Sequence, residues 1–161
     1  MVCIRSATDA DLQALWRYNV DSNSGDDRWV RWQEQYIGYN RSGAARTFAV
    51  VVDGVPVGEG TLLFLPSCSA IGGRNVLADG KTTVNLNALR IQKPWEGCGY
   101  ISAMVRQMEA YARDNGFSRI TIGVDQCEAR NRAIYAHWGY SRLLFTEVED
   151  GEPVLYYEKD L

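Results

Sequence analysis

The sequence predicts an α/β (α+β) fold, with one domain built on a mixed sheet. Three observations lead to this prediction. Short apolar strands alternate with amphipathic helices along the chain. An Asp53-Gly54 turn joins two segments rich in β-branched residues, and a turn with Gly97 and Gly99 joins an apolar strand to a long helix. A chain of 161 residues with 46% hydrophobic and 23% charged residues can build the core of one globular domain.

The first half of the chain is expected to form a strand, two helices and a β-hairpin. Thr8 or Asp9 is a suitable N-cap for the first helix. Asp53-Gly54 supplies the positive φ angles that a tight hairpin turn needs. The expected elements are the strand Val2–Ala7, a helix with Leu12, Leu15 and Trp16, the helix Asp26–Tyr39 with Trp29, Trp32, Tyr36 and Tyr39, and the strands Arg46–Val52 and Pro56–Leu65.

The second half alternates strands and helices after a loop. The longest helix carries an apolar stripe and ends at Asn115-Gly116, a good left-handed cap. The stripe consists of Ile101, Met104, Val105, Met108 and Tyr111 or Ala112. The expected elements are the loop Pro66–Lys81, the strand Thr82–Ile91, the helix Tyr100–Asn115, the strand Ser118–Val124, the helix Glu128–Trp138 ended by Gly139, and the strands Tyr140–Val148 and Pro153–Lys159 around Asp150-Gly151.

The glycine-rich turn between residues 89 and 99 is the strongest functional signal. Glycine lets a ligand approach the backbone closely, and the free amides at a helix start favour an anion. The pattern is therefore typical of a phosphate or pyrophosphate site, although Gly-x-Gly turns also end ordinary strands. No Gly-x-x-x-x-Gly-Lys-[Ser/Thr] motif is present, which argues against a nucleoside triphosphate site. The third glycine of a dinucleotide fingerprint would fall at Ser102, which disfavours a nicotinamide cofactor.

Composition excludes several classes of function. A net charge of −3 argues against a dedicated nucleic-acid binder and is compatible with an amine substrate. No apolar run approaches the ~20 residues of a membrane span, and the N-terminus has no signal-peptide pattern. The only histidine is His137, so we expect no metal site. Four widely spaced cysteines, Cys3, Cys68, Cys98 and Cys127, indicate free thiols and a cytoplasmic protein.

Three separated segments, together with the order of elements, resemble the GNAT superfamily of N-acetyltransferases. They are Ile4–Leu12, Leu89–Gly99 with the helix to Ala112, and Ala133–Tyr140. The resemblance covers nearly the whole chain and implies one acyl-CoA N-acyltransferase-like domain over residues 1–161. It also implies a largely antiparallel sheet with helices on both faces, whose parallel central pair, the fourth and fifth strands, is splayed at the cofactor cleft.

This resemblance implies a reaction. Acetyl-CoA would serve as co-substrate, and its acetyl group would pass directly to a primary amine of a small molecule or a protein. The backbone of Leu89 and Ile91 would pair with the pantetheine arm, and the following turn would hold the pyrophosphate. The cofactor-binding residues implied in this way are Leu89, Ile91, Gly97, Cys98, Gly99, Tyr100, Ile101 and Asn131.

The resemblance also implies catalytic roles. Tyr135 matches a tyrosine proposed as general acid towards the coenzyme A sulfur, and the alternative is a core aromatic. Asn85 falls where some members carry a glutamate, and an amide cannot act as a base. Asp125 and Glu59 are the nearest carboxylate candidates, with Asp125 as the catalytic candidate. The alternative for both is a solvated or strand-end charge, and a water relay from bulk solvent would make a dedicated base unnecessary.

The sequence departs from the family pattern at functional positions. Glu96 stands where members carry Arg or Gln, and Glu128 stands where many carry Asn. The alternative function is therefore a degenerate, non-catalytic member that binds acyl-CoA or acts as a sensor. Cys98 is either a reactive thiol at a helix start or a solvent-facing residue. The aromatic residues of the second helix fit an acceptor pocket, the core or the face of a homodimer.

Overall fold

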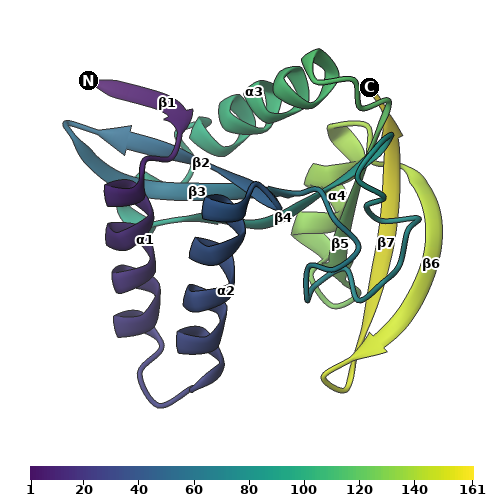
Figure 1. The fold of residues 1–161 in the computed structure, drawn as a ribbon, viewed down its shortest axis with the longest axis horizontal. Helices are drawn as coiled ribbons and strands as arrows, with labels where there is room; N and C mark the ends of the chain where they lie inside the picture. Colours follow the sequence, from purple (N-terminus) through teal and green to yellow (C-terminus); the bar gives the residue numbers. More distant parts are fainter. The chain divides into compact units, whose positions relative to one another are not determined.

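The computed structural model describes residues 1–161, which form the four α-helices and seven strands shown in Figure 1. The elements in chain order are β1 (Val2–Ser6), α1 (Asp9–Ser22), α2 (Arg28–Ser42), β2 (Ala45–Val52), β3 (Val55–Leu63), β4 (Thr83–Ile91), the 3-10 helix η1 (Lys93–Trp95), α3 (Tyr100–Asp114), β5 (Arg119–Asp125), α4 (Ala129–His137), β6 (Arg142–Glu149) and β7 (Glu152–Asp160). The strand order in the sheet is β1-β2-β3-β4-β5-β7-β6. Only β4 and β5 form a parallel pair, so the predicted mixed, largely antiparallel sheet is confirmed.

Every expected helix and strand is present, with differences at the ends. The helix expected over Asp26–Tyr39 runs instead over Arg28–Ser42, because Gly43, with φ of 83°, supplies the left-handed residue that ends it. The short helix η1 was not anticipated, although Pro94 is well suited to the start of a helix. None of the helices is both long enough and apolar enough to cross a membrane.

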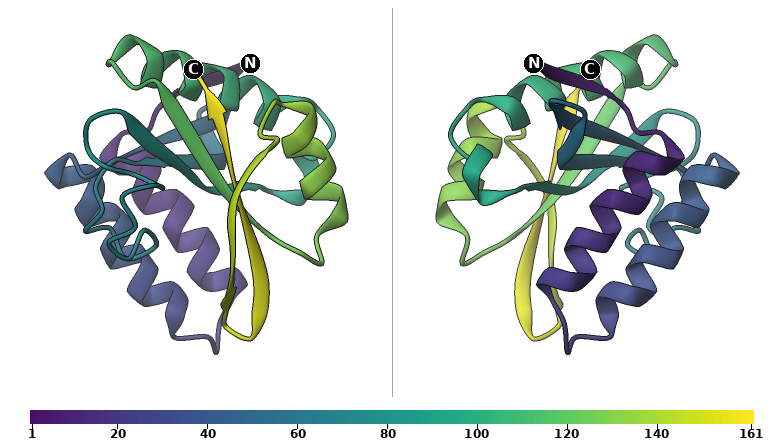
Figure 2. Two further views of the ribbon diagram at one scale, coloured as in Figure 1. Left: turned by 90° about the vertical axis from the view of Figure 1, so that its right-hand side faces the viewer. Right: turned by 90° about the vertical axis from the view of Figure 1, so that its left-hand side faces the viewer.

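The chain divides into two compact units. The first unit contains Met1–Leu63 and Ala88–Met108, and therefore holds β1 to β3, both N-terminal helices, the end of β4 and the start of α3. Strands β2 and β3 form a hairpin around Asp53, which has φ of 49°, and β1 pairs with β2 from Val2–Val52 to Ser6–Phe48. Both views in Figure 2 show α1 and α2 side by side as an antiparallel pair.

Adjacent residues of β3 show which helices cover each face of this unit. The Glu59 carboxylate accepts a hydrogen bond of 3.1 Å from the Asn19 amide of α1. A Cβ atom at the next residue, Gly60, would lie 3.0 Å from the Met104 methyl group and 3.0 Å from the Met108 sulfur of α3. Because side chains alternate along a strand, α1 lies on one face of β3 and α3 lies on the other.

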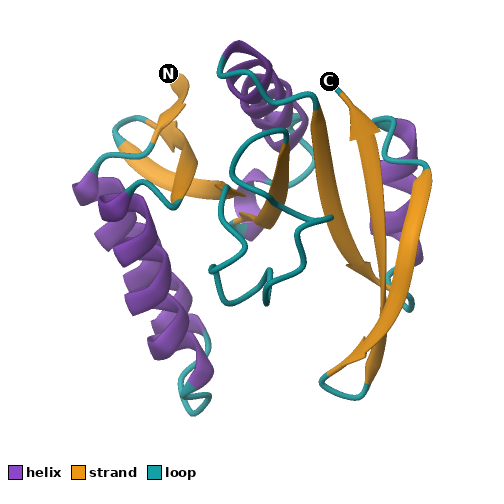
Figure 3. Cartoon of the chain, turned by 45° about the vertical axis from the view of Figure 1, so that its right-hand side comes forward, coloured by secondary structure: helices purple, strands orange, loops and turns teal.

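The second unit contains Phe64–Asn87 and Glu109–Leu161. It holds the start of β4, the strands β5 to β7 and helix α4, and its long loop has no helix or strand, as Figure 3 shows. The parallel pairing of β4 with β5 runs from Thr83–Arg119 to Leu86–Ile122. This pairing confirms that the two strands are parallel neighbours. Their splay beyond Leu86 stays a prediction.

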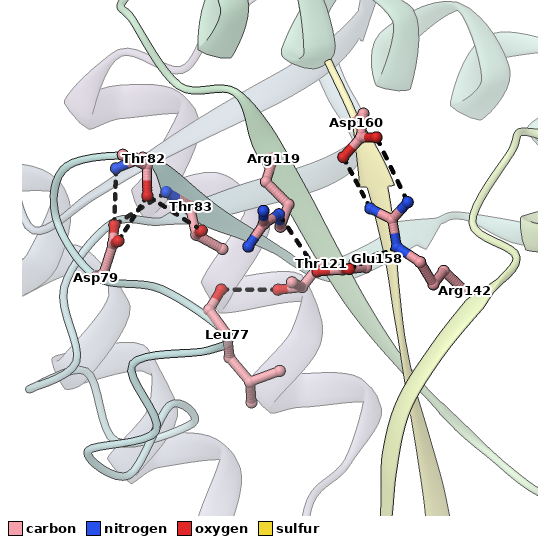
Figure 4. Close-up of polar contacts among 9 residues, drawn as sticks. All are labelled: Leu77, Asp79, Thr82, Thr83, Arg119, Thr121, Arg142, Glu158 and Asp160. Carbon is pink, nitrogen blue, oxygen red and sulfur yellow. Dashed lines mark hydrogen bonds and ion pairs between the residues drawn. The ribbon is translucent and has the colours of Figure 1, made fainter.

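Polar side chains fix the strands of the second unit, as Figure 4 shows. Asp79 accepts backbone hydrogen bonds from Lys81, Thr82 and Thr83 at 2.8–2.9 Å, which lower the pKa of its carboxyl group. The buried Thr121 hydroxyl donates to the Leu77 carbonyl at 2.7 Å. These bonds attach the loop to the first residues of β4 and to the middle of β5.

Candidate functional site

The turn before α3 has the backbone that the glycine pattern predicts. Gly97 and Gly99 have φ angles of 75° and 79°, a region that residues with a side chain rarely adopt. No atom lies within 4 Å of a Cβ built at either glycine, so the turn is open on this side. The Ala103 amide donates to the Gly99 carbonyl at 3.1 Å, and the amides from 99 to 102 precede this first helical bond. Such a set of amides, at the positive end of the α3 dipole, suits a phosphate group.

Cys98 lies between these two glycines and is exposed. Its thiol donates to the Glu96 carbonyl at 3.8 Å, within the same turn. Glu96 is also exposed, directly after η1. Both side chains therefore lie at the surface of the turn.

The end of β4 contains a local irregularity that the sequence did not indicate. Ala88 has φ of 57°, a left-handed conformation in the middle of a strand, which is typical of a β-bulge. Leu89 follows it, and its Cδ2 atom would be only 2.7 Å from a Cβ at Gly60, on the α3 face. Such strained residues persist where the surrounding structure holds them, and they concentrate at functional sites. Leu89 and Ile91, the expected partners of the pantetheine arm, follow this left-handed residue in β4.

Glu59 is almost completely buried, with 2% of the residue exposed. Its Oε1 atom accepts hydrogen bonds from the Asn19 amide and from the Arg90 guanidinium. Its Oε2 atom is enclosed and has no hydrogen-bond partner. Burial raises the pKa of the Glu59 carboxyl, while Arg90 and Asn19 oppose this shift. The expectation that Glu59 is a solvated charge is therefore wrong.

The Arg90 guanidinium is held between this carboxylate and two tryptophans. Its central carbon lies 4.9 Å from the ring centroid of Trp29 and 5.4 Å from that of Trp16. Both distances are in the range of cation–π contacts. The side chain of Arg90 is 30% exposed, and its only hydrogen bond runs from Nη1 to Glu59. Nε and Nη2 therefore keep three N–H donors without a protein partner.

Tyr135, the candidate acid, lies in α4 within the second unit and is partly buried. Its ring lies 5.7 Å from that of Trp138, measured between centroids. Its hydroxyl forms no hydrogen bond within the protein. Burial, followed by the charge of Glu128, raises the pKa of the Tyr135 hydroxyl to about 12. The group is therefore protonated at neutral pH and is free to donate.

Asp125, the candidate base, is the last residue of β5 and is partly buried. Burial raises the pKa of its carboxyl, and the neighbouring carboxylates of Glu128, Glu152 and Glu149 add to the effect. A raised pKa brings a carboxylate closer to the range in which it can accept a proton from an ammonium group. Asp125 is thus a strand-end charge, as the alternative held, and its role as a base stays a prediction.

The other polar residues singled out in the sequence lie in the second unit. The Asn131 amide donates to Glu128 Oε2 at 2.7 Å, at the start of α4. Asn85 is buried, and its amide donates to the Thr121 hydroxyl at 2.9 Å. His137 is exposed at the last residue of α4. No group of three or more His, Cys, Asp or Glu side chains is arranged to hold a metal ion.

The predicted residues thus fall into two sets. Leu89, Ile91 and the turn from Gly97 to Ile101 belong to one continuous segment of the first unit. Tyr135, Asp125 and Asn131 belong to the second unit. Sequence reasoning missed Arg90, although the helical spacing of aromatic residues did single out Trp29.

A known protein family matches most of the chain. Residues 11–140 match the family model described as Acetyltransferase (GNAT) family. Among curated proteins, none matches the chain significantly by sequence.

Solved structures extend this likeness over the full chain. Ribosomal-protein-alanine N-acetyltransferase from Brucella melitensis has a TM-score of 0.72 at 18% identity and covers 99% of both chains. The Salmonella typhimurium protein yncA, solved with its cofactor acetyl-CoA, has a TM-score of 0.73 at 15% identity over 100% of this chain and 94% of its own. PaiA N-acetyltransferase from Thermoplasma acidophilum, in complex with coenzyme A, has a TM-score of 0.66 at 14% identity over 100% and 99%. At these identities the likeness concerns the fold.

Proposed function

Because the chain belongs to the GNAT acetyltransferase family, we propose that it is an acetyl-CoA-dependent N-acetyltransferase that acts on a primary amine by direct transfer. The observation that carries this proposal is the open turn at Gly97 and Gly99, whose amides lead into α3. Two structural neighbours that contain coenzyme A or acetyl-CoA support the choice of co-substrate.

The donor set of the turn fits a pyrophosphate. The amides of Gly97, Cys98, Gly99, Tyr100 and Ile101 would bind its oxygens, and no side chain occupies the open side of either glycine. The backbone of Leu89 and Ile91 would pair with the pantetheine arm. Asn131 is the remaining proposed contact.

The reaction assigns three tasks to this chain. The amine nitrogen forms a bond to the thioester carbonyl carbon, the carbon–sulfur bond breaks, and the products are an N-acetyl compound and the coenzyme A thiol. Backbone amides at Leu89 or Ile91 would stabilise the oxyanion. Tyr135 would donate a proton to the departing thiolate, and Asp125 would accept the proton that the amine loses. Asp125 suits this task better than Glu59, because Glu59 is only 2% exposed and Arg90 is bound to one of its oxygens.

The wider setting completes the proposal. Residues 1–161 would act as one acyl-CoA N-acyltransferase-like domain in the cytoplasm, without a metal. The acceptor would be an amine of a small molecule or a protein rather than a nucleic acid or a membrane, and the net charge of −3 is compatible with a cationic acceptor.

A non-catalytic acyl-CoA-binding or sensor protein is the second candidate. The observation that favours it is the negative charge near the proposed cofactor-binding residues. Glu96 adds a carboxylate at the turn, and Glu128 accepts the Asn131 amide that the proposal assigns to the cofactor. Both features would weaken the attraction for an anionic cofactor.

Two measurements distinguish these candidates. Calorimetry with acetyl-CoA tests binding, and release of the free coenzyme A thiol in the presence of a panel of amines tests turnover. We expect binding together with turnover of at least one amine. Binding without any turnover would favour the sensor, and the absence of both would contradict both candidates.

A further inference from the structure

We propose that Arg90 binds the carboxylate of the acceptor, so that the amine acetylated by this protein belongs to an amino acid or a similar small molecule with a carboxylate. This inference rests on the proposed acetyl transfer and adds the chemical class of the acceptor. It is carried by the unused donors of Arg90 and by the way in which this side chain is held.

The guanidinium has the hydrogen-bonding capacity for such a ligand. Arginine has five N–H donors in a planar fork that matches a carboxylate. Arg90 uses one of them, from Nη1 to Glu59. Its side chain is 30% exposed. Nε and Nη2 have no protein partner, and neither atom is buried. The Nε–Nη2 edge is therefore accessible, and a carboxylate could accept two parallel hydrogen bonds from it.

The surroundings of Arg90 fix this edge in place. Trp16 and Trp29 contact the guanidinium through their rings, at 5.4 and 4.9 Å from the centroids. Glu59 holds the Nη1 atom, and Glu59 is itself held by the Asn19 amide at 3.1 Å. Because the side chain is ordered before a ligand arrives, less conformational entropy is lost on binding. Glu59 is therefore a positioning residue, and its enclosed Oε2 atom does not meet the ligand.

The position of Arg90 in the chain connects it to the reaction. It lies between Leu89 and Ile91, the residues whose backbone is proposed to hold the pantetheine arm. Leu89 lies on the α3 face, whereas the Arg90 side chain lies on the opposite face, with Glu59 and α1. An acceptor bound by Arg90 would therefore be anchored at the same segment of β4 that is proposed to present the thioester.

Matched acceptors provide the test. The thiol-release assay is run with a panel of amino acids and with the corresponding amino-acid amides, which keep the amine and lose the negative charge. We expect kcat/KM to be roughly 10- to 100-fold higher for the acid than for its amide, mainly through KM. In the double variant Glu59→Gln/Arg90→Gln, which leaves no buried charge unpaired, this ratio should fall to about one. Arg90→Lys, which keeps the charge without the fork, should give an intermediate ratio.

The control is another arginine that is stacked on a tryptophan. Arg28 lies 5.4 Å from the Trp32 ring centroid and donates to Asp26 at 2.9 Å, on the exposed start of α2. Arg28→Gln should keep the ratio of acid to amide. Equal rates for acid and amide in the unmodified protein, or an unchanged ratio in the double variant, would overturn the assignment.

Binding separates a failure of this assignment from a failure of the proposed function. Calorimetric titration of the same amino acids is carried out with coenzyme A present, whether or not any of them is acetylated. If no amine is turned over, the proposed function fails. Amino-acid binding that the double variant abolishes would still support a carboxylate site at Arg90, and no binding to either protein would overturn it.

Discussion

Arg90 in the first unit and Arg142 in the second both bind a glutamate that is almost fully buried, yet they differ in their other donors. Arg142 donates from Nε to Glu158 at 2.6 Å and from Nη2 to Asp160 at 2.7 Å, with a third, longer bond of 3.4 Å to Asp160 (Figure 4). Arg90 donates one hydrogen bond and rests on two tryptophan rings. Each of the three Arg142 nitrogens thus donates to a carboxylate within the protein, whereas Nε and Nη2 of Arg90 stay available for a ligand.

The same contrast separates the tyrosines of the second unit. The Tyr140 hydroxyl donates to Glu109 at 2.7 Å, and the Tyr156 hydroxyl donates to Glu149. Both bonds satisfy a group that folding removes from water. The Tyr135 hydroxyl forms no such bond. The bonded hydroxyls of Tyr140 and Tyr156 are thus expected to serve stability, and the unbonded hydroxyl of Tyr135 is expected to serve the reaction.

The largest expected effect concerns these tyrosines. Tyr135→Phe should lower kcat by roughly 10²–10⁴, since the hydroxyl is needed only while the carbon–sulfur bond breaks. Acetyl-CoA affinity should change little, because the ground state does not use this proton. The measurements are steady-state kinetics, calorimetry with acetyl-CoA and the melting temperature, all on one preparation.

Tyr140→Phe is the matched control, because it also removes one hydroxyl. It leaves Glu109 without one partner and should lower the free energy of unfolding by about 1–3 kcal/mol, with full activity of the folded fraction. An unchanged kcat in Tyr135→Phe would reject its acid role and leave solvent as the proton donor. Equal losses of stability in both variants would contradict the assignment of different roles to Tyr135 and Tyr140.

The second effect concerns stability at the two arginines. Arg90→Gln should lower the free energy of unfolding by about 3–5 kcal/mol, because Glu59 stays buried without a cation. Arg142→Gln should lower the free energy of unfolding much less than Arg90→Gln, because Arg142 is 53% exposed and Arg119 remains 3.4 Å from Glu158. Urea unfolding at neutral pH measures both.

The double variant Glu59→Gln/Arg90→Gln should recover most of the loss seen in Arg90→Gln, since it removes both charges together. Similar losses from Arg90→Gln and Arg142→Gln would show that the two ion pairs do not differ in burial as the structure indicates.

The third effect is that the contributions of two carboxyl groups, Glu59 and Asp79, to stability change in opposite directions as pH changes. Burial raises the pKa of Glu59 above its ordinary value of 4.5, so the folded state binds the proton more tightly than the unfolded state. The contribution of Glu59 to stability should therefore fall as pH rises above 4.5, by about 1.4 kcal/mol for each tenfold difference in proton affinity. For Asp79, hydrogen bonds lower the pKa below 3.8, and its contribution should fall as pH drops below that value.

Urea unfolding between pH 3 and pH 8 measures both effects, with Glu59→Gln and Asp79→Asn as references that do not titrate. Relative to Glu59→Gln, the free energy of unfolding of the unmodified protein should decrease as pH rises above 4.5. A difference with the same pH slope for both residues would contradict the burial of Glu59.

Local signals in the sequence account for most of the fold. Asp53-Gly54 marks the hairpin, Thr8 caps α1 through its hydroxyl, and the apolar stripe of α3 is buried at Met104, Met108 and Ala112. Each of these features depends on neighbouring residues, which is why pattern and structure agree. Gly97 and Gly99 also have the left-handed backbone that their pattern indicates.

The features that the sequence did not indicate depend on distant residues or on strain. Glu59 lies in an ordinary strand pattern, and its burial results from partners 40 and 31 residues away, Asn19 and Arg90. Ala88 adopts a left-handed conformation that alanine disfavours, so no propensity predicts it. The role of Arg90 follows only after these contacts are known, because its functional feature is the set of donors that the fold leaves unused.

The smallest expected effect tests whether an exposed charge at the turn affects cofactor binding and leaves stability unchanged. Glu96 is exposed and forms no side-chain hydrogen bond, so Glu96→Gln should leave stability within about 0.5 kcal/mol. It removes a carboxylate near the proposed pyrophosphate and should tighten acetyl-CoA binding about two- to fivefold at low salt, with a smaller gain at high salt. Calorimetry at two salt concentrations measures this gain. The control is Glu34→Gln, which removes an exposed carboxylate on α2. Weaker binding in Glu96→Gln would mean that this carboxylate supports the turn instead of repelling the cofactor, and an equal gain in Glu34→Gln would assign the effect to net charge alone.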